Sequence, residues 1–65
     1  MNSKQIIGLI MAKTGETVPT HAAKSGYTPQ AWYDVIKGRT KTVELRQAIA
    51  TLSATPESEL WPESK

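Results

Sequence analysis

The sequence predicts an all-α protein: a compact bundle of about five short helices in a single domain, residues 1–65. Three observations support this fold class. Apolar residues recur at helical spacing, no segment has the clean alternation of a β-strand, and glycine or proline interrupts the chain at short intervals. A chain of 65 residues forms one domain at most. A domain of this size buries only about 60% of the surface its unfolded chain exposes, so we expect a small core.

The first helix is expected to begin at Ser3 as N-cap and to end near Lys13, where Gly15 stops it. Its broad apolar face comprises Ile6, Ile7, Leu9, Ile10 and Met11. The segment "GETVPT" is a connector. A second short helix follows, with Pro19 at its first helical position and Gly26 as its stop.

A third helix is predicted from Pro29 to about Lys37, with Thr28 as N-cap and Gly38 as a left-handed exit. After the polar loop "RTKT", Thr42 can cap a fourth helix. The apolar residues of that helix are Val43, Leu45, Ala48, Ile49 and Leu52.

One last helical turn is predicted in "SATPESELWP", with Thr55 as cap and Pro56 first. Its acidic residues lie near the positive helix end, and Leu60 and Trp61 are expected to pack back on the bundle. Residues 63–65 are expected to form a loose tail.

The composition excludes several classes of protein. The chain has no cysteine and no set of Cys and His at zinc-ligand spacing, so we expect no disulfide scaffold, no metal and no cofactor, and a cytoplasmic location. The apolar run near the start, residues 6–12, is far shorter than the roughly 20 residues a membrane span needs. Its flanks do not resemble those of a signal peptide.

The formal charge of +2 is unevenly distributed. Through Ala54 there are seven lysines and arginines against three acids, whereas the last eleven residues hold three glutamates and Lys65. A basic body with a small acidic tail suits a polyanionic partner, although many solvated surfaces have the same composition.

The stretch "SGYTPQAWYDVIKGRTK" links two short helices by a tight turn containing glycine, and the second helix runs into a basic loop. This arrangement describes a helix-turn-helix over about residues 18–38. It resembles the phage repressor family that includes Cro and the lambda-like repressors. That family spaces a small alanine, a turn glycine four residues on, and branched apolar residues six and nine after the glycine. Those positions are occupied here by Ala22, Gly26, Trp32 and Val35.

Further fragments narrow the resemblance. Lys37-Gly38 stands where the family often closes its recognition helix with asparagine-glycine, and "GYTP" and "TPESELWP" are similar to the Ner-type regulators of transposing phages. The similarity covers roughly residues 4–62. His21 and Ser25 replace larger apolar residues of the family and Trp32 replaces isoleucine or valine, so we expect the indole to fill the space its smaller neighbours leave.

A recognition helix enters the major groove and contacts base edges near its N-terminal end. With Trp32 and Val35 facing the core, the outward residues predicted to meet bases are Thr28, Gln30, Tyr33 and Asp34. Gln30 can pair bidentately with adenine or remain a solvated glutamine. Thr28 combines the roles of cap and phosphate donor.

Tyr33 and Asp34 keep alternatives open. Tyr33 can pack on a thymine methyl, bond a phosphate or merely cover the domain surface, and Asp34 can accept from cytosine or hold Lys37 at i,i+3.

Phosphate contacts are expected from four residues outside the base-contacting set: Lys37, Arg39, Lys41 and Thr20. The alternative for the three cations is a solvated charge run. Lys24 and Arg46 can join these contacts or only balance charge. His21 is expected to bind no metal, and Trp32 and Trp61 to lie in the core.

The resemblance implies a sequence-specific DNA-binding transcriptional regulator, a repressor that binds a palindromic double-stranded operator as a homodimer. The alternative is a small helical protein-interaction module, such as an antitoxin or a phage-encoded inhibitor, that uses Leu60, Trp61 and the first helix. Catalysis is not expected, because no triad is evident and so short a chain has little room for a cleft. We likewise expect no membrane partner and no small-molecule substrate.

Overall fold

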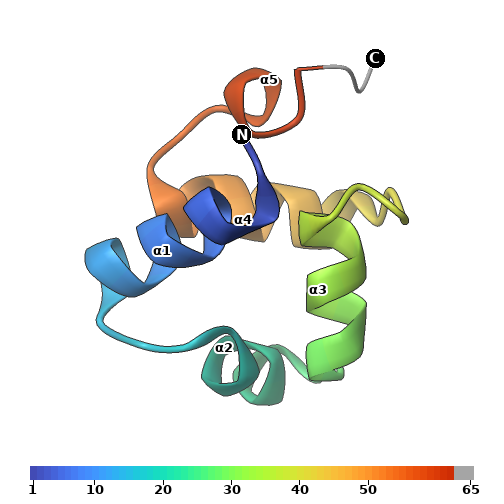
Figure 1. Ribbon diagram of the computed structural model, residues 1–65. Helices are drawn as coiled ribbons and strands as arrows, with labels where there is room; N and C mark the ends of the chain where they lie inside the picture. Colours follow the sequence, from blue (N-terminus) through green and yellow to red (C-terminus); the bar gives the residue numbers. More distant parts are fainter. Residues whose placement is uncertain (63–65) are drawn as a thin grey trace.

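A computed structural model of the chain describes residues 1–62 and contains, over that range, helices and no strand. The five helices are α1 (Ser3–Thr14), α2 (Val18–Ser25), α3 (Pro29–Ile36), α4 (Val43–Ser53) and α5 (Glu57–Leu60). The prediction of an all-α bundle of five short helices is confirmed (Figure 1). The expected tail, residues 63–65, lies outside the described residues.

The helices surround one core. α1 and α4 pack together through the middle of the bundle, α2 packs against α3, and α3 runs along one side to reach α4 (Figure 1). The short α5 packs on α4 at the opposite end from α2. The molecule is compact, with extents of 28 × 22 × 17 Å. Over residues 1–62, none of the helices has the length and apolar character that a membrane crossing requires.

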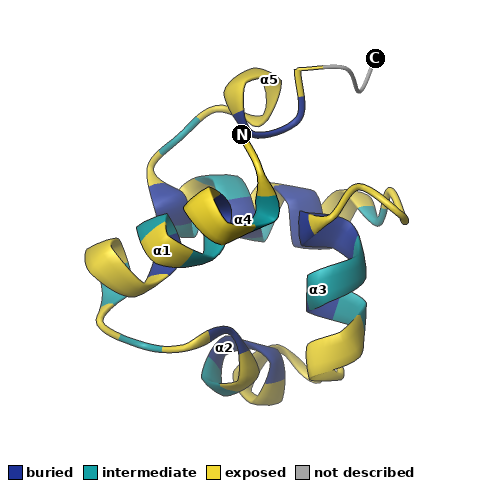
Figure 2. Cartoon of the chain, in the orientation of Figure 1, coloured by how far each residue is buried: buried dark blue, intermediate teal, exposed yellow. Residues whose placement is uncertain are grey.

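The residues coloured as buried lie mainly on the facing sides of the helices (Figure 2). The apolar core consists of Ile6, Ile10, Val18, Ala22, Trp32, Val35, Ile36, Leu45, Ile49, Leu60 and Trp61. Both tryptophans therefore belong to the core, and Leu60 and Trp61 pack back on the bundle, as predicted. Met11 and Val43 were expected on apolar faces but are 47% and 64% exposed, because each extends beyond the inward side of its helix.

Most helix ends follow the chemistry of single residues. Gly15 and Gly26 end α1 and α2 in the left-handed conformation, with φ of 73° and 81°. Thr28 caps α3, since its hydroxyl oxygen accepts from the Ala31 amide at 3.2 Å. Gly38, with φ of 80°, provides the predicted left-handed exit after α3.

Three predicted helix starts are wrong by one position. Asn2, and not Ser3, caps α1, because its carboxamide oxygen accepts from the Gln5 amide at 2.8 Å and Gln5 bonds back to the Asn2 amide at 3.1 Å. α2 begins at Val18, which places Pro19 second.

The last helix differs in the same way. Pro56 is the N-cap of α5, and its carbonyl accepts from the Leu60 amide at 3.2 Å. Thr55 was expected as the cap, but its hydroxyl donates to the Ser53 carbonyl at 3.0 Å instead. Thr42 does occupy the N-cap position of α4, although its side chain makes no capping bond.

The predicted exchange of volume around Trp32 is confirmed. The His21 ring stacks on the indole with centroids 6.0 Å apart, and Trp32 Nε1 donates to Ser25 Oγ at 3.1 Å. Smaller polar residues on α2 therefore accommodate a large ring from α3 and satisfy its one donor.

Candidate functional site

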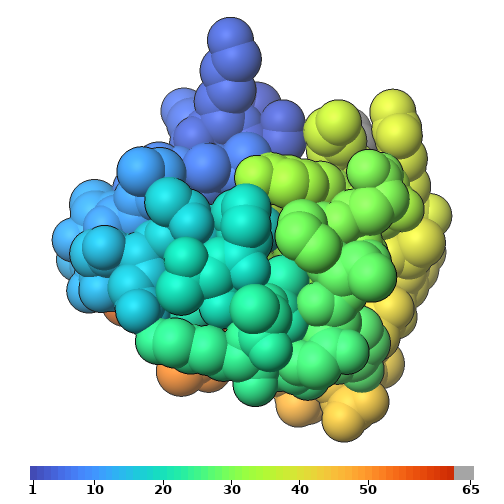
Figure 3. Space-filling view, turned by 90° about the horizontal axis from the view of Figure 1, so that it is seen from below, coloured from blue at the N-terminus to red at the C-terminus, as the bar shows by residue number. Residues whose placement is uncertain are grey.

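The two sides of α3 differ in character. Trp32, Val35 and Ile36 point into the core and are at most 2% exposed. The opposite side is polar, and its residues follow one another at spacings of three and four: Gln30, Tyr33, Asp34 and Lys37. α2 and α3 lie side by side on one face of the molecule, and the loop after α3 stands at the edge of that face (Figure 3).

Asp34 is the centre of the contacts on this polar side. Its Oδ1 accepts from Gln30 Nε2 at 2.9 Å and lies 3.9 Å from Arg39 Nη1. Of the two alternatives for Asp34, the pairing with Lys37 is not formed. Lys37 is the C-cap of α3, and the left-handed Gly38 that follows it turns the chain so that the Arg39 amide donates to the Asp34 carbonyl at 2.8 Å.

The Gln30–Asp34 contact has a chemical consequence. A primary amide carries two N–H donors and one carbonyl acceptor. Bonding to Asp34 uses one N–H and orients the group, so the second N–H and Oε1 remain available side by side for a ligand. The spacing of four residues that joins Gln30 and Asp34 is visible in the sequence and could have revealed this pair.

The remaining base-contact candidates occupy different environments. Thr28 lies exposed at the tip of α3, with its role as cap confirmed. Tyr33 is half-buried and packs against the core, which agrees with the surface-covering alternative.

The cations differ in their surroundings. Lys37, Arg39 and Lys41 are all exposed in the loop between α3 and α4. Lys24 instead donates to both carboxylate oxygens of Glu16, at 2.8 and 2.7 Å, and this bond lowers the pKa of Glu16 below its ordinary value. This ion pair agrees with the charge-balancing alternative for Lys24. Thr20 lies in the first turn of α2, where its hydroxyl shares a 3.0 Å hydrogen bond with Thr17.

Arg46 packs against the core, a position that neither of its alternatives described. It is only 9% exposed, and its guanidinium lies over the Trp61 ring, 4.6 Å from the ring centroid. The sequence feature that could have predicted this burial is the position of Arg46 three residues before Ile49, on the inward side of α4.

His21 is engaged in packing. The Thr14 hydroxyl donates to the Ile10 carbonyl at 2.7 Å, so it accepts from His21 Nε2 at 2.9 Å, and this assigns the ring proton to Nε2. Within residues 1–62, no three His, Cys, Asp or Glu side chains gather where they could hold a metal ion.

Comparison with known proteins finds no matching family model, no significantly similar curated protein and no significantly similar solved structure.

Proposed function

We propose that this chain is a sequence-specific DNA-binding regulator in which α2, the turn at Gly26 and α3 form a helix-turn-helix, with α3 as the recognition helix. One observation carries the proposal: the exposed polar side of α3 continues without a break into a loop with three exposed cations. A helix that presents hydrogen-bonding side chains beside a concentrated positive charge suits a groove lined by phosphates.

Gln30 provides the specific contact. An α-helix, about 10–12 Å across, fits the major groove of B-DNA, which is about 12 Å wide. The second N–H and Oε1 of Gln30 match N7 and the amino group of adenine. Asp34 serves this contact by holding the amide, and the nearby Arg39 offsets the repulsion between its carboxylate and the phosphates.

The loop supplies affinity. Lys37, Arg39 and Lys41 can contact phosphates on one side of α3, while Thr28 and the free amides at its N-terminus can contact phosphates on the other. We assign Thr20, in the first turn of α2, and the Tyr33 hydroxyl to the same backbone contacts. Because phosphates are alike in every sequence, these residues position the domain without selecting the operator.

The rival function, a protein-interaction module, has less support. It required Leu60, Trp61 and the apolar residues of α1, yet Leu60 is 0% and Trp61 is 7% exposed, and Ile6 and Ile10 are buried. In the described part of the chain, the exposed large apolar residues are Met1, Met11 and Val43, too few for an extensive hydrophobic interface.

Selection of bound duplexes from a random DNA pool tests the proposal. We expect a recovered site with two-fold symmetry and an affinity that falls steeply with salt. Replacing Arg39 or Lys41 by alanine should reduce the slope of log K against log salt by about 0.9 for each phosphate that the variant no longer neutralises. Lys24→Ala is the matched control, since Lys24 is paired with Glu16. Recovery of no enriched sequence, together with salt-insensitive binding, would refute DNA recognition.

A further inference from the structure

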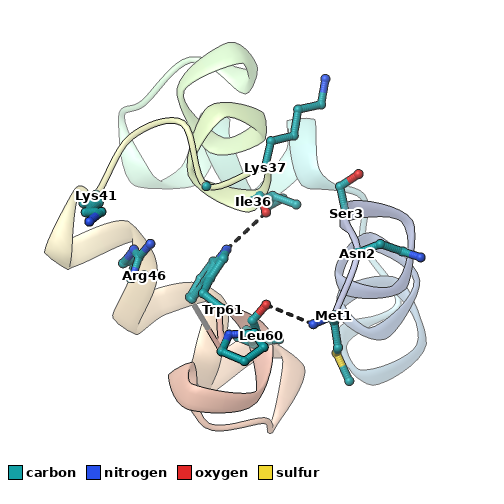
Figure 4. Close-up of a pocket in the computed structure, with 11 residues that line it drawn as sticks. Met1, Asn2, Ser3, Ile36, Lys37, Lys41, Arg46, Leu60 and Trp61 are labelled. Carbon is teal, nitrogen blue, oxygen red and sulfur yellow. Dashed lines mark hydrogen bonds between the residues drawn. The ribbon is translucent and has the colours of Figure 1, made fainter. Parts of the chain in front are cut away.

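A cavity of about 560 Å³ lies between the start of α1, the loop that joins α3 to α4, and the segment after α5 (Figure 4). Lys37, Lys41 and Arg46 contribute to its lining, and none of the described residues that line it is acidic. Trp61 lies at the centre of the site, with Arg46 and Lys41 on one side of it and Asn2 and Ser3 on the other (Figure 4).

Arg46 is the unusual member of this lining. Its side chain is about nine-tenths buried, and its Nε has no hydrogen-bond partner among the residues that the structure describes. The Trp61 ring beneath the guanidinium stabilises its charge but does not satisfy donors that lie in the guanidinium plane. A buried cation with an unused donor normally has an anionic partner.

The walls of the cavity are held in place by hydrogen bonds. Trp61 Nε1 donates to the Ile36 carbonyl at 3.1 Å, which ties the indole to the end of α3. The Met1 nitrogen donates to the Glu59 and Leu60 carbonyls at 3.1 and 3.3 Å. Ser3 adds a first-turn amide of α1 that has no carbonyl within the helix to bond, at the positive end of the helix dipole.

We propose that this cavity is a binding site for a phosphate group. Lys41, the guanidinium of Arg46 and the first-turn amide of Ser3 line a space without acidic residues among those described, and Lys37 adds positive charge at its edge. This lining suits a compact anion that accepts several hydrogen bonds. The volume exceeds that of a phosphate ion, so a phosphate ester fits as well as free phosphate. The group comes either from solution or from the DNA backbone, and the second source rests on the proposed function.

Titration of the full chain with inorganic phosphate, followed by ¹H–¹⁵N NMR at constant ionic strength, tests this site without DNA. We expect saturable shifts of the Trp61 indole N–H and the Arg46 Nε–H. The Trp32 indole N–H, bonded to Ser25 outside the cavity, is an internal control and should not move.

Two variants sharpen this test. Lys41→Met should weaken phosphate binding by about fivefold, as expected when one exposed charge is removed. Lys13→Met removes the same charge from an exposed residue that does not line the cavity, and it should leave the affinity unchanged. Equal reductions in the two variants, or linear shifts without saturation, would overturn the proposal. Because Arg46 is buried, Arg46→Met is informative only while the Trp32 indole signal keeps its folded position.

A duplex DNA titration separates the two sources. If DNA moves the Trp61 and Arg46 signals and free phosphate competes with it, the cavity binds a backbone phosphate. If phosphate moves these signals and DNA does not, the site is specific for the free ion. If neither ligand moves them while α3 signals respond to DNA, the cavity site is refuted and the proposed function stands.

Discussion

Gln30 and Asp34 form the contact on which the proposed base recognition depends, because a glutamine held by a carboxylate loses less side-chain freedom on binding than a mobile one. We expect Gln30→Ala to cost about 1–3 kcal/mol on the preferred DNA site and little on random DNA. Asp34→Ala should lower the preference for the selected site over random DNA by a smaller factor than Gln30→Ala does. It should also raise the affinity for random DNA, since a negative charge is removed.

The measurement is the affinity of each variant for the selected site and for a scrambled duplex at one salt concentration. An equal reduction on both duplexes for Gln30→Ala would mean that α3 is not the base-contacting helix.

The side chain of Trp32, on α3, contacts two residues of α2 and so joins the two helices. The indole is 1% exposed, stacks on His21 and donates to Ser25, so Trp32→Ala should destabilise the domain by about 3–5 kcal/mol. Ser25→Ala leaves Nε1 without an acceptor and should cost less, about 1–3 kcal/mol. Urea denaturation measures both changes. Wild-type stability in Trp32→Ala would contradict the buried position of the ring.

For single residues, the sequence predicted burial in the core better than it predicted contacts between surface side chains. The inward positions of Trp32 and Val35 follow from helical periodicity alone, and they are correct. The partner of Asp34 depends on how the chain turns after Gly38, and Arg46 depends on where Trp61 comes to lie, fifteen residues further along the chain. Neither contact is a property of its local segment.

The end of α4 contains a strained residue. Ala54 has φ of 53°, in the left-handed region that favours glycine. We expect Ala54→Gly to stabilise the protein by about 1 kcal/mol, because the relief of strain exceeds the added freedom of the unfolded chain. Gly26→Ala is the matched opposite change: φ is 81° and an added methyl group meets no neighbour, so only strain changes and the protein should be destabilised. Denaturation midpoints that shift in the same direction for both variants would contradict this explanation.

The C-terminal ends of helices were predictable where glycine is the one residue nearby that adopts the left-handed conformation without strain. Glycine in the left-handed conformation correctly ended α1 and α2. Three helix starts lie one residue from their predicted positions, and at the start of α1 the reason is two suitable caps side by side. Asn2 prevails over Ser3 because Gln5 returns its hydrogen bond, and Thr55 does not cap α5 because its hydroxyl bonds Ser53.

The size of the whole molecule bears on how it would bind an operator. Its longest extent is 28 Å, shorter than the roughly 34 Å that separate successive major grooves on one side of the duplex. A single copy therefore presents one α3 to one groove, and one short helix contacts only a few base pairs. Two copies, one per half-site, can lie side by side at this spacing without overlap.

We therefore expect cooperative binding of two copies to a symmetric site with half-sites about 34 Å apart, and weak association of the protein in solution. The DNA supplies the effective concentration that the isolated domains lack, because the second copy binds beside one already in place. Sedimentation velocity with and without DNA, and affinity for duplexes with one or two half-sites, measure both quantities. Inserting about five base pairs, half a helical turn, between the half-sites should abolish the cooperativity, since it rotates the second groove to the opposite face. Monomers that bind a single half-site tightly, with no gain from a second, would contradict the dimeric arrangement and leave the recognition by α3 intact.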